Sequence, residues 1–476
     1  MTDAIRVRNR LFGSRKFYIH TLSIAIPIML QSLIQSMVSL IDNFMVSGLG
    51  DICMSGVNVA GQVLFVFFVY LNAICMAGGI FMTQYFGAKD PEGMKQAFRF
   101  KLLMGLVAFA PFVLVCLVFP RQVLSLMLIG NTDASLILDQ AVGYIRIAFF
   151  MGLPMTFSLC IATSLRDLGE VKSPLVVTII ATLTNTFFNY CLIYGNLGFP
   201  RLEVRGAAIA TVIARSVEVI IFLGIYMKRK PDFMIGFRNA FKLDGKLFLK
   251  MLRKGSLVLF CEMVWVFSET VTTAIYNGRG GADVVSGMAS SFAIANLFFV
   301  AFGGIYSATG VILGKTLGMG ELEEARKEKT WLLSGSAVFG IMMTVFGLST
   351  TLLIPVVFGK LSVGALLICR RMVILMSIFM PVWVYMNSQT AVARAGGDTA
   401  MGAIADSLIT IFVMMPMLFV LAFFTSIGPV GMYMGVKLLD IVKVIAFQIW
   451  LKKERWLKNL AKQEVPEKAE EAITEQ

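Results

Sequence analysis

Apolar stretches long enough to cross a bilayer recur along almost the whole chain, and short polar or glycine-containing segments separate them. A transmembrane helix needs about 20 predominantly apolar residues. The pattern therefore predicts an all-α integral membrane protein with twelve transmembrane helices. The predicted spans are residues 18–46, 53–82, 98–119, 142–164, 174–194, 206–227, 251–276, 284–313, 331–358, 372–393, 401–424 and 429–451.

Short motifs repeat between the two halves of the chain. The segment SGVNVAG from Ser55 matches SGMASSF from Ser286, which lies 231 positions later, and the same offset places Gly87 on Gly318. Each half then contains six spans in the same orientation, a parallel repeat that suits alternating access. The predicted parts are an N-terminal six-helix bundle (1–227), a basic cytoplasmic linker (228–250), a C-terminal six-helix bundle (251–451) and a cytoplasmic tail (452–476).

Composition and charge agree with a membrane protein. Hydrophobic residues make up 57% of the chain and charged residues 15%, whereas soluble domains carry about 25% charged residues. The net charge of +13 follows the topology, because basic residues gather before the first span and in every second connection. By the positive-inside rule we expect a multi-pass plasma-membrane protein with both termini cytoplasmic. The charge is therefore no sign of a nucleic-acid partner.

Asp42 is the residue of the first span that most needs an explanation. A carboxylate at membrane depth costs about 3 kcal/mol on insertion scales, so it normally faces a bundle interior or water. Pro27 removes a hydrogen bond from the same helix and allows it to bend. A bendable helix that carries an acidic group is a candidate moving part. The alternative is that Asp42 lies near the outer interface, beside Ser47 and Gly50, as an ordinary polar residue at a helix end.

The chemistry of a membrane enzyme is missing from the sequence. His20 is the one histidine, and no H-E-x-x-H, G-x-S-x-G or nucleotide-binding motif occurs in a fitting context. Direct use of ATP is therefore not expected, and transport would depend on an ion gradient. The seven cysteines have no metal-site spacing and are expected to be core residues: Cys53, Cys75, Cys116, Cys160, Cys191, Cys261 and Cys369.

Several motifs together resemble the multidrug and toxic compound extrusion (MATE) family over nearly the whole chain. They are PIMLQSLIQSMVSLIDNFMVSGLG, YFGAKD, LRDLGEVKSP, NTFFNYCLIYGNLGFPRLEVRGAAIAT and ARAGGDT, in that order. The resemblance implies a twelve-helix transporter of two bundles that expels organic, often cationic, compounds in exchange for Na⁺ or H⁺. It implies no cofactor besides this coupling ion. We expect the chain to act as a monomer in contact with membrane lipid.

The resemblance places the cation site of the first bundle on Asp42, Asn185, Asn189 and Thr211. Asn185 and Asn189 are four residues apart and so lie on one helix face. Carboxylate and amide oxygens suit a hard cation, so Na⁺ at Asp42, Asn185 and Asn189 is one possibility. Proton carriage by a buried Asp42 is the other. Alternatively, the two asparagines only hydrogen-bond neighbouring helices.

In the second bundle, Glu262 stands where some branches of the family have a carboxylate on the seventh helix, and Glu269 follows two turns later. Both carboxylates could attract a cationic substrate, with Trp265 supplying a cation-π surface. Gln35 of the first span is a further candidate. Other branches have a carboxylate on the tenth helix, but residues 383–387 offer none.

Two matters stay open at this stage. A lipid-linked precursor flippase is an alternative function, although its cavity would favour several arginines for phosphate. The roles of several charged residues within the spans are also undecided. The pairs Arg215 with Glu218, and Asp440 with Lys437 and Lys443, have the spacing for pairing within a helix, and Asp406 has no evident partner.

Overall fold

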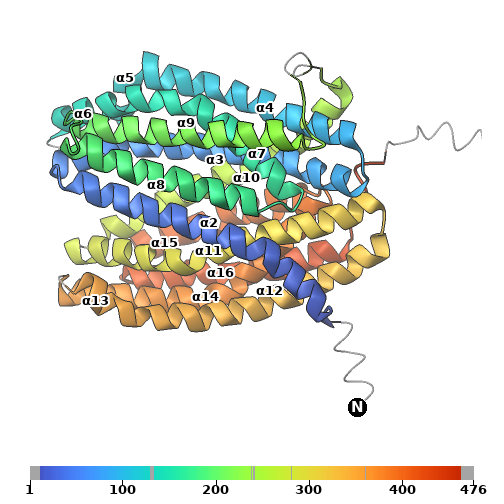
Figure 1. The fold of residues 1–476 in the computed structure, drawn as a ribbon. Coiled ribbons are helices and arrows are strands. Elements are labelled where there is room, and N and C mark those ends of the chain that lie inside the picture. Colours follow the sequence, from blue (N-terminus) through green and yellow to red (C-terminus); the bar gives the residue numbers. More distant parts are fainter. Residues whose placement is uncertain are drawn as a thin grey trace, which may run out of the picture.

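The computed structural model describes residues 11–128, 133–236, 239, 242–279, 281–359 and 361–462, and the regular structure of these residues is helical throughout. The basic residues before residue 11 and the tail from residue 463 lie outside the described residues. Long helices run side by side along one common direction (Figure 1). The first half contains α2 (Arg15–Ser47), α3 (Asp51–Gly87), α4 (Pro91–Val113), α5 (Pro120–Leu126), α6 (Ala134–Ala148), α7 (Gly152–Asp167), α8 (Lys172–Tyr194) and α9 (Glu203–Arg229).

The second half repeats this arrangement with interruptions at different places. It contains α10 (Gly245–Gly278), α11 (Ala282–Met319), α12 (Leu322–Thr350), α13 (Ile354–Phe358), α14 (Val363–Ala395), the π-helical segments η5 (Gly402–Ser407) and η6 (Thr410–Met414), α15 (Met415–Phe424) and α16 (Pro429–Lys452). In the first half, the π-helical segment η1 (Leu114–Val118) follows α4, and the short 3₁₀ turn η2 (Phe149–Met151) joins α6 to α7.

The twelve predicted spans all coincide with helical segments, and the predicted fold class is confirmed. Among the described residues, eleven helices are long and apolar enough to cross a membrane, judged by length and composition alone. The twelfth predicted span is α16, which falls outside that set. It carries three charged residues in its middle, Lys437, Asp440 and Lys443, and Asp440 and Lys443 are buried within the protein.

Capping residues and prolines explain where several helices begin or change. The Ser14 hydroxyl accepts a hydrogen bond from the Phe17 amide, and the Asp90 carboxylate accepts one from the Gly93 amide, so each satisfies a backbone donor of a first turn. Pro27 lies inside α2, which continues through it as one helix. The helix therefore contains a position that lacks a backbone hydrogen bond and is suited to bending.

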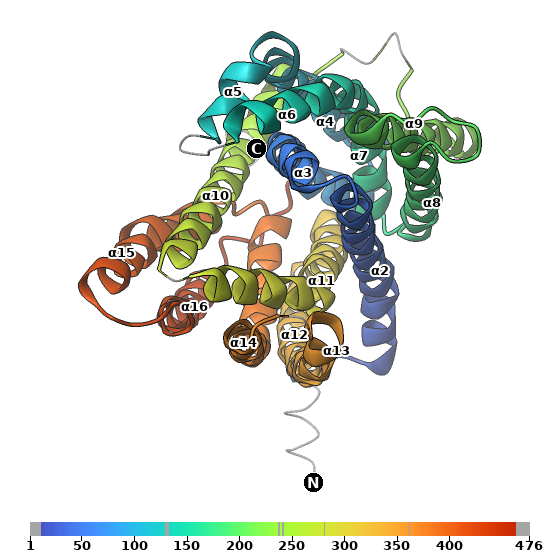
Figure 2. The ribbon, with the colours of Figure 1, turned by 90° about the vertical axis from the view of Figure 1, so that its left-hand side faces the viewer.

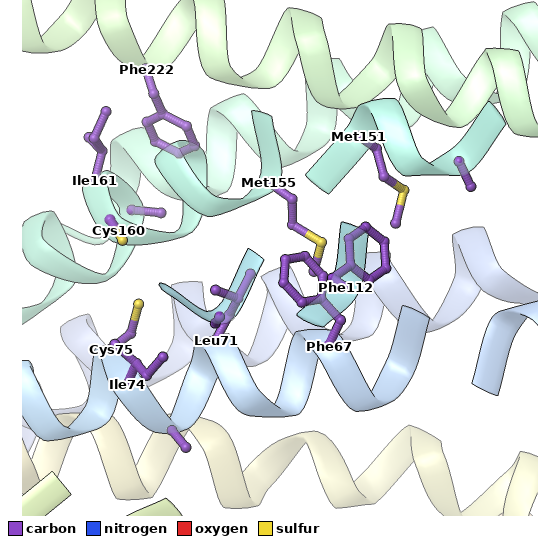
Figure 3. Packing of buried hydrophobic residues seen from close by; sticks show 14 of the residues in the cluster. Phe67, Leu71, Ile74, Cys75, Phe112, Met151, Met155, Cys160, Ile161 and Phe222 are labelled. Carbon is purple, nitrogen blue, oxygen red and sulfur yellow. The ribbon is translucent and has the colours of Figure 1, made fainter. Parts of the chain in front are cut away.

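The two halves of the chain form two groups of helices that face each other (Figure 2). Each group has its own apolar core, and Figure 3 shows part of the first one. There Phe67 stacks on Phe112 with 4.1 Å between ring centroids. Helices α2 and α10 lie at the flanks and also pack across the divide, α2 against α11 and α10 against α3. All seven cysteines are free, as expected, and six of them are buried.

A reciprocal contact joins the two halves near the ends of α3 and α11. A Cβ atom added at Gly87 would lie 2.0 Å from the Lys315 carbonyl oxygen, and one added at Gly318 would lie 2.0 Å from the Gln84 carbonyl oxygen. Gly87 and Gly318 are separated by 231 positions, and so are Gln84 and Lys315. The contact is therefore repeated about the pseudo-two-fold axis, and only glycine allows backbones to approach so closely.

The C-terminal segment that follows α16 packs into the same end of the molecule. Trp456 is fully buried, and its carbonyl lies against Gly396, the residue after α14. The Gln84 side chain accepts from the Leu460 amide and donates 2.7 Å to the Ala395 carbonyl. The segment up to residue 462 therefore bridges both halves rather than extending freely into solvent.

Candidate cation-binding sites

The structure brings together all four residues predicted for the first-bundle site. Asn189 Nδ2 donates a 2.7 Å hydrogen bond to Asp42 Oδ1 and a 3.2 Å bond to Asn185 Oδ1. Asn185 Nδ2 lies 3.5 Å from the Thr211 hydroxyl. Helices α2, α8 and α9 thus converge on one carboxylate. Asn185 and Asn189 are 5% and 1% exposed, so the amides lie in the bundle interior, as their spacing predicts.

Oxygen atoms in this cluster remain available for a ligand. The Asn189 carbonyl oxygen is buried and has no hydrogen-bond partner. The Asn185 amide can turn, and in its other orientation its nitrogen donates to both Asp42 oxygens, at 2.8 and 3.2 Å. In that orientation two amide nitrogens, one from Asn185 and one from Asn189, donate to the Asp42 carboxylate.

The donor set fits a small hard cation. Carboxylate, amide and hydroxyl oxygens are the ligands that such ions prefer, and Asp42, Asn185, Asn189 and Thr211 supply them. The described residues contain no group of three or more His, Cys, Asp or Glu side chains that could hold a metal ion. A site with one carboxylate and several neutral oxygens suits a monovalent ion better than a tightly held divalent one.

Neighbouring side chains enclose the cluster. Tyr144 of α6 is buried beside Thr211. One turn beyond Thr211 on α9, Arg215 forms a 2.7 Å ion pair with Glu218, as the three-residue spacing predicts. The guanidinium is therefore engaged by its own carboxylate and does not form an ion pair with Asp42.

Gln35 and Pro27 lie on the same helix as Asp42 but are not part of the cluster. Gln35 is exposed, and among the described residues no hydrogen bond is recorded for its side chain. Gln31, one turn earlier, is buried instead and donates a 2.7 Å bond to the Thr178 hydroxyl of α8. This bond ties α2 to α8 between Pro27 and Asp42.

Glu262 of the second bundle is held by an arginine that the sequence did not reveal as its partner. Both terminal nitrogens of Arg394 lie 3.1 Å from Glu262 Oε1, and one of them also donates 3.1 Å to the Tyr306 hydroxyl. Arg394 is 8% exposed. The predicted carboxylate is thus neutralised within the protein, with α10, α11 and α14 joined through it. Trp265, by contrast, is 51% exposed.

Glu269 belongs to a different cluster, which contains a lysine. Lys437 Nζ of α16 lies 3.7 Å from Glu269 Oε1. The same ammonium lies over the rings of Trp383 and Tyr433, at 5.7 and 5.5 Å from the centroids. Trp383 Nε1 in turn donates 2.8 Å to Asp440 Oδ2. A carboxylate does therefore lie beside the segment 383–387, but α16 supplies it rather than the tenth span.

Asp406 has a partner in the structure. Lys443 Nζ donates 2.7 Å to Asp406 and 2.8 Å to the Thr410 hydroxyl. Both acceptors lie in the π-helical segments η5 and η6, whose wider turns present them to α16. Lys443 therefore pairs across helices, and the pairing of Lys443 with Asp440 suggested by their spacing is not the one that forms.

The sequence alone did not single out Tyr144, Arg394 or Lys437 as neighbours of these carboxylates. Each comes from a helix far along the chain from the carboxylate that it approaches. The sequence held one indication that Arg394 matters. It lies in the motif ARAGGDT of the second half, which corresponds to the motif LRDLGEVKSP around Arg166 in the first half. The structure shows the first of these arginines in an ion pair.

Comparison with known proteins gives a consistent result. Residues 27–191 match the MatE family model. The transporter YisQ of Bacillus subtilis is 25% identical over 68% of this chain and 71% of its own length. The probable multidrug resistance protein YoeA of Bacillus subtilis is 23% identical over 90% of this chain and 93% of its own length.

Solved structures of similar fold cover almost the whole chain. A MATE structure in a straight conformation has a TM-score of 0.80 with 18% identity, over 92% of this chain and 95% of that one. A variant of the Vibrio cholerae MATE transporter VcmN has a TM-score of 0.81 with 16% identity, over 93% and 98% of the two chains. At these identities the likeness concerns the fold.

Proposed function

We propose that the chain is a MATE-family secondary active multidrug transporter that exports organic cations in exchange for Na⁺ or H⁺. Family membership rests on the MatE match and on homologues named as multidrug resistance proteins, among them the probable NorM of Thermotoga maritima. The substrate charge, the coupling ion and the antiport are parts of the proposal. They are supported by the chemistry of the Asp42 cluster.

The observation that carries the proposal is a carboxylate inside a helix bundle whose partners are neutral. Asp42 receives a hydrogen bond from the Asn189 amide, and the buried carbonyl oxygen of Asn189 has no hydrogen-bond partner. A carboxylate with neutral amide partners is left able to bind an incoming cation or proton. Its cost at membrane depth is offset when the ion binds. Such a site suits a coupling ion that binds and leaves in every cycle.

Four basic side chains of the interior are already engaged by carboxylates, which favours a cationic substrate. Lys101, Arg394, Lys437 and Lys443 are each paired with a carboxylate. A phosphate-recognising cavity needs basic groups that are free to bind an anion. The flippase alternative is therefore less well supported than cation export.

The joint between the bundles and Pro27 suggest how exchange could be coupled. The reciprocal Gly87 and Gly318 contact holds the halves together at the end where the basic connections lie, the end we propose to be cytoplasmic. Bending of α2 at Pro27 would move Asp42 relative to α8. Cation or proton binding at Asp42 and substrate occupancy would then favour opposite orientations of the bundles, as alternating access requires.

The experiment is efflux of a fluorescent organic cation from proteoliposomes, with Na⁺ and H⁺ gradients imposed separately. We expect one gradient to drive efflux. Stimulation by Na⁺ alone would assign the oxygen cluster of Asp42, Asn185 and Asn189 to that ion, and stimulation by H⁺ alone would assign Asp42 as a proton carrier.

The control for the Asp42→Asn variant is Asp139→Asn, which removes an exposed carboxylate that pairs with Arg121. This variant should transport as the unmodified protein does. If neither gradient moves any cation tested, the export proposal fails, and a lipid-linked anionic substrate becomes the next one to test.

A further inference from the structure

Lys437 occupies a position in the second bundle that has the features of a binding site for an ammonium ion. Its ammonium lies 3.7 Å from the Glu269 carboxylate and over the rings of Trp383 and Tyr433. Ring faces carry negative partial charge and attract cations, and a carboxylate beside them adds a charge partner. Aromatic surfaces combined with a carboxylate are the means by which proteins recognise organic ammonium groups.

The surrounding residues hold this aromatic site in shape. Trp383 is fixed by its 2.8 Å hydrogen bond to Asp440, and the ring of Phe379 stacks on it at 5.7 Å. Tyr433 is 3% exposed and packs against Tyr276 with 6.0 Å between ring centroids. The lysine side chain is 15% exposed. The site is therefore built from packed rings, and the ammonium does not simply rest on a surface.

Three buried hydroxyl groups on α10, the helix that carries Glu269, have no hydrogen-bond partner among the described residues. Ser268, Thr272 and Tyr276 follow one another at four-residue intervals on α10, and their exposures are 3%, 4% and 2%. None of the three hydroxyls has a partner. A buried hydroxyl left without a partner costs about 1–3 kcal/mol, so three on one helix face indicate that polar groups or water complete the site. Tyr276 lies within electrostatic range of both Lys437 and Glu269.

We infer that the second bundle contains a site for an organic ammonium group that the chain fills with its own Lys437. The ligand class is a primary alkylammonium, whose charge replaces the lysine ammonium and whose short apolar stem replaces the lysine side chain. The role of Lys437 is to occupy this site permanently. If the proposed exchange function is correct, Asp42 is then the exchangeable cation site of the two.

The first test is chemical rescue of Lys437→Ala, in which n-propylammonium replaces the atoms lost from Cγ to Nζ. The purified variant should melt at a lower temperature than the unmodified protein. Millimolar n-propylammonium should raise its melting temperature in a saturable manner, because a ligand that binds only the folded state stabilises it by mass action. We expect recovery of about half of the loss or more at saturation. Neutral n-propanol, which has the same shape, should recover none of it.

The matched control is Lys315→Ala, which also removes a lysine that lies over a ring, that of Phe86 at 5.7 Å. Lys315 is exposed and, among the described residues, forms no ion pair with a carboxylate. Its variant should not respond to n-propylammonium. If both variants respond equally, or if n-propanol is as effective as the amine, the inference is wrong.

A second variant guards against failure of the first to fold. Lys437→Met keeps the apolar stem and removes only the charged group, so ammonium chloride should raise its melting temperature more than sodium chloride does at equal ionic strength. An equal response to the two salts would overturn the inference. These measurements involve no transport, and a failure of the efflux experiment would leave their outcome unaffected.

Discussion

The carboxylates of the candidate sites are held in different ways in the two bundles. In the first, Asp42 is hydrogen-bonded by the neutral amide of Asn189, and a second amide lies beside it. In the second, Glu269 faces the ammonium of Lys437 and Glu262 faces the guanidinium of Arg394. A neutral partner leaves the carboxylate able to attract another cation, whereas a charged partner satisfies it. Duplicated halves can therefore share a fold and differ in which of them exchanges an ion.

The largest expected effect on transport comes from removing one carboxylate at a time. We expect Asp42→Asn to lower gradient-driven efflux at least about tenfold, a loss of about 1.4 kcal/mol or more. Glu269→Gln should keep efflux within about threefold per folded molecule, because its charge is already met by Lys437. Efflux rates from proteoliposomes, normalised to folded protein, measure both. The opposite ranking of the two variants would reverse the assignment of the exchanging half.

The largest effect on stability concerns two buried ion pairs, one in each half. Lys101 is fully buried and donates a 2.6 Å hydrogen bond to Asp167, while the side chain of Arg394 is 10% exposed and lies 3.1 Å from Glu262. Removal of one partner of a buried pair costs about 3–5 kcal/mol, because the other charge is left alone. We expect Lys101→Met to lower the melting temperature more than Arg394→Met.

Double variants serve as controls for these ion pairs. Adding Glu262→Gln to Arg394→Met should recover most of the lost stability, because no buried charge is then left without a partner. If the double variant is as unstable as the single one, packing of the arginine rather than its charge is responsible.

A smaller effect is expected where the two halves are alike. At Gly87 and at Gly318 an added Cβ would lie 2.0 Å from a backbone carbonyl oxygen of the other half. Gly87→Ala and Gly318→Ala should each destabilise this joint by about 1–3 kcal/mol and should act similarly. Melting temperature and labelling of an engineered cysteine near the joint would measure the change.

Gly61→Ala on α3 and Gly310→Ala on α11 are the controls, because nothing lies within 4 Å of their Cβ positions. A strong effect in only one half would contradict the equivalence.

The smallest effect is expected for the exposed ion pair of Glu454 with Arg326, which serves as a reference for the buried ion pairs. Glu454 accepts hydrogen bonds of 2.9 and 2.6 Å from Arg326, and this hydrogen bonding lowers the pKa of Glu454. A lowered folded-state pKa stabilises the protein above the ordinary value of about 4.3, and the gain disappears as pH falls through the folded-state pKa. Because both groups are about 40% exposed, we expect less than about 1 kcal/mol.

The measurement is the difference in melting temperature between the unmodified protein and Glu454→Gln. This difference should stay constant from pH 7 down to about 5, should shrink as pH falls below about 4.3, and should shrink at high salt. A difference that persists well below pH 4 would show that the carboxylate charge has no role.

The sequence predicted the helices well because apolar length is a local property. The same is true of the Asn185 and Asn189 spacing, which places both amides on one face of α8. The pairing of Glu269 with Lys437, however, joins residues 168 positions apart. Which faces of α10 and α16 meet depends on how both helices rotate in the packed bundle, and no local pattern records this. Helix α16 shows that prediction from local sequence is limited in the same way. Its charged residues Lys437, Asp440 and Lys443 are tolerated only because other helices supply their partners.

The tail shows a similar limit of local patterns. Its charged composition favoured a separate cytoplasmic segment from residue 452 onward. The structure buries Trp456 fully and ties Gln84 to Leu460. A single aromatic residue within a basic segment was the one local sign of this docking.

The reciprocal joint between Gly87 and Gly318 bears on how such a chain could have arisen. Because Gly87 meets Lys315 and Gly318 meets Gln84 at the same 231-residue offset, the two contacts would be a single contact made twice in a symmetric pair of identical six-helix chains. This is the isologous geometry of a two-fold homodimer. A gene duplication with fusion would preserve the glycine contact and free each half to change its interior, so that one half could keep a carboxylate with neutral partners while the other acquired a lysine.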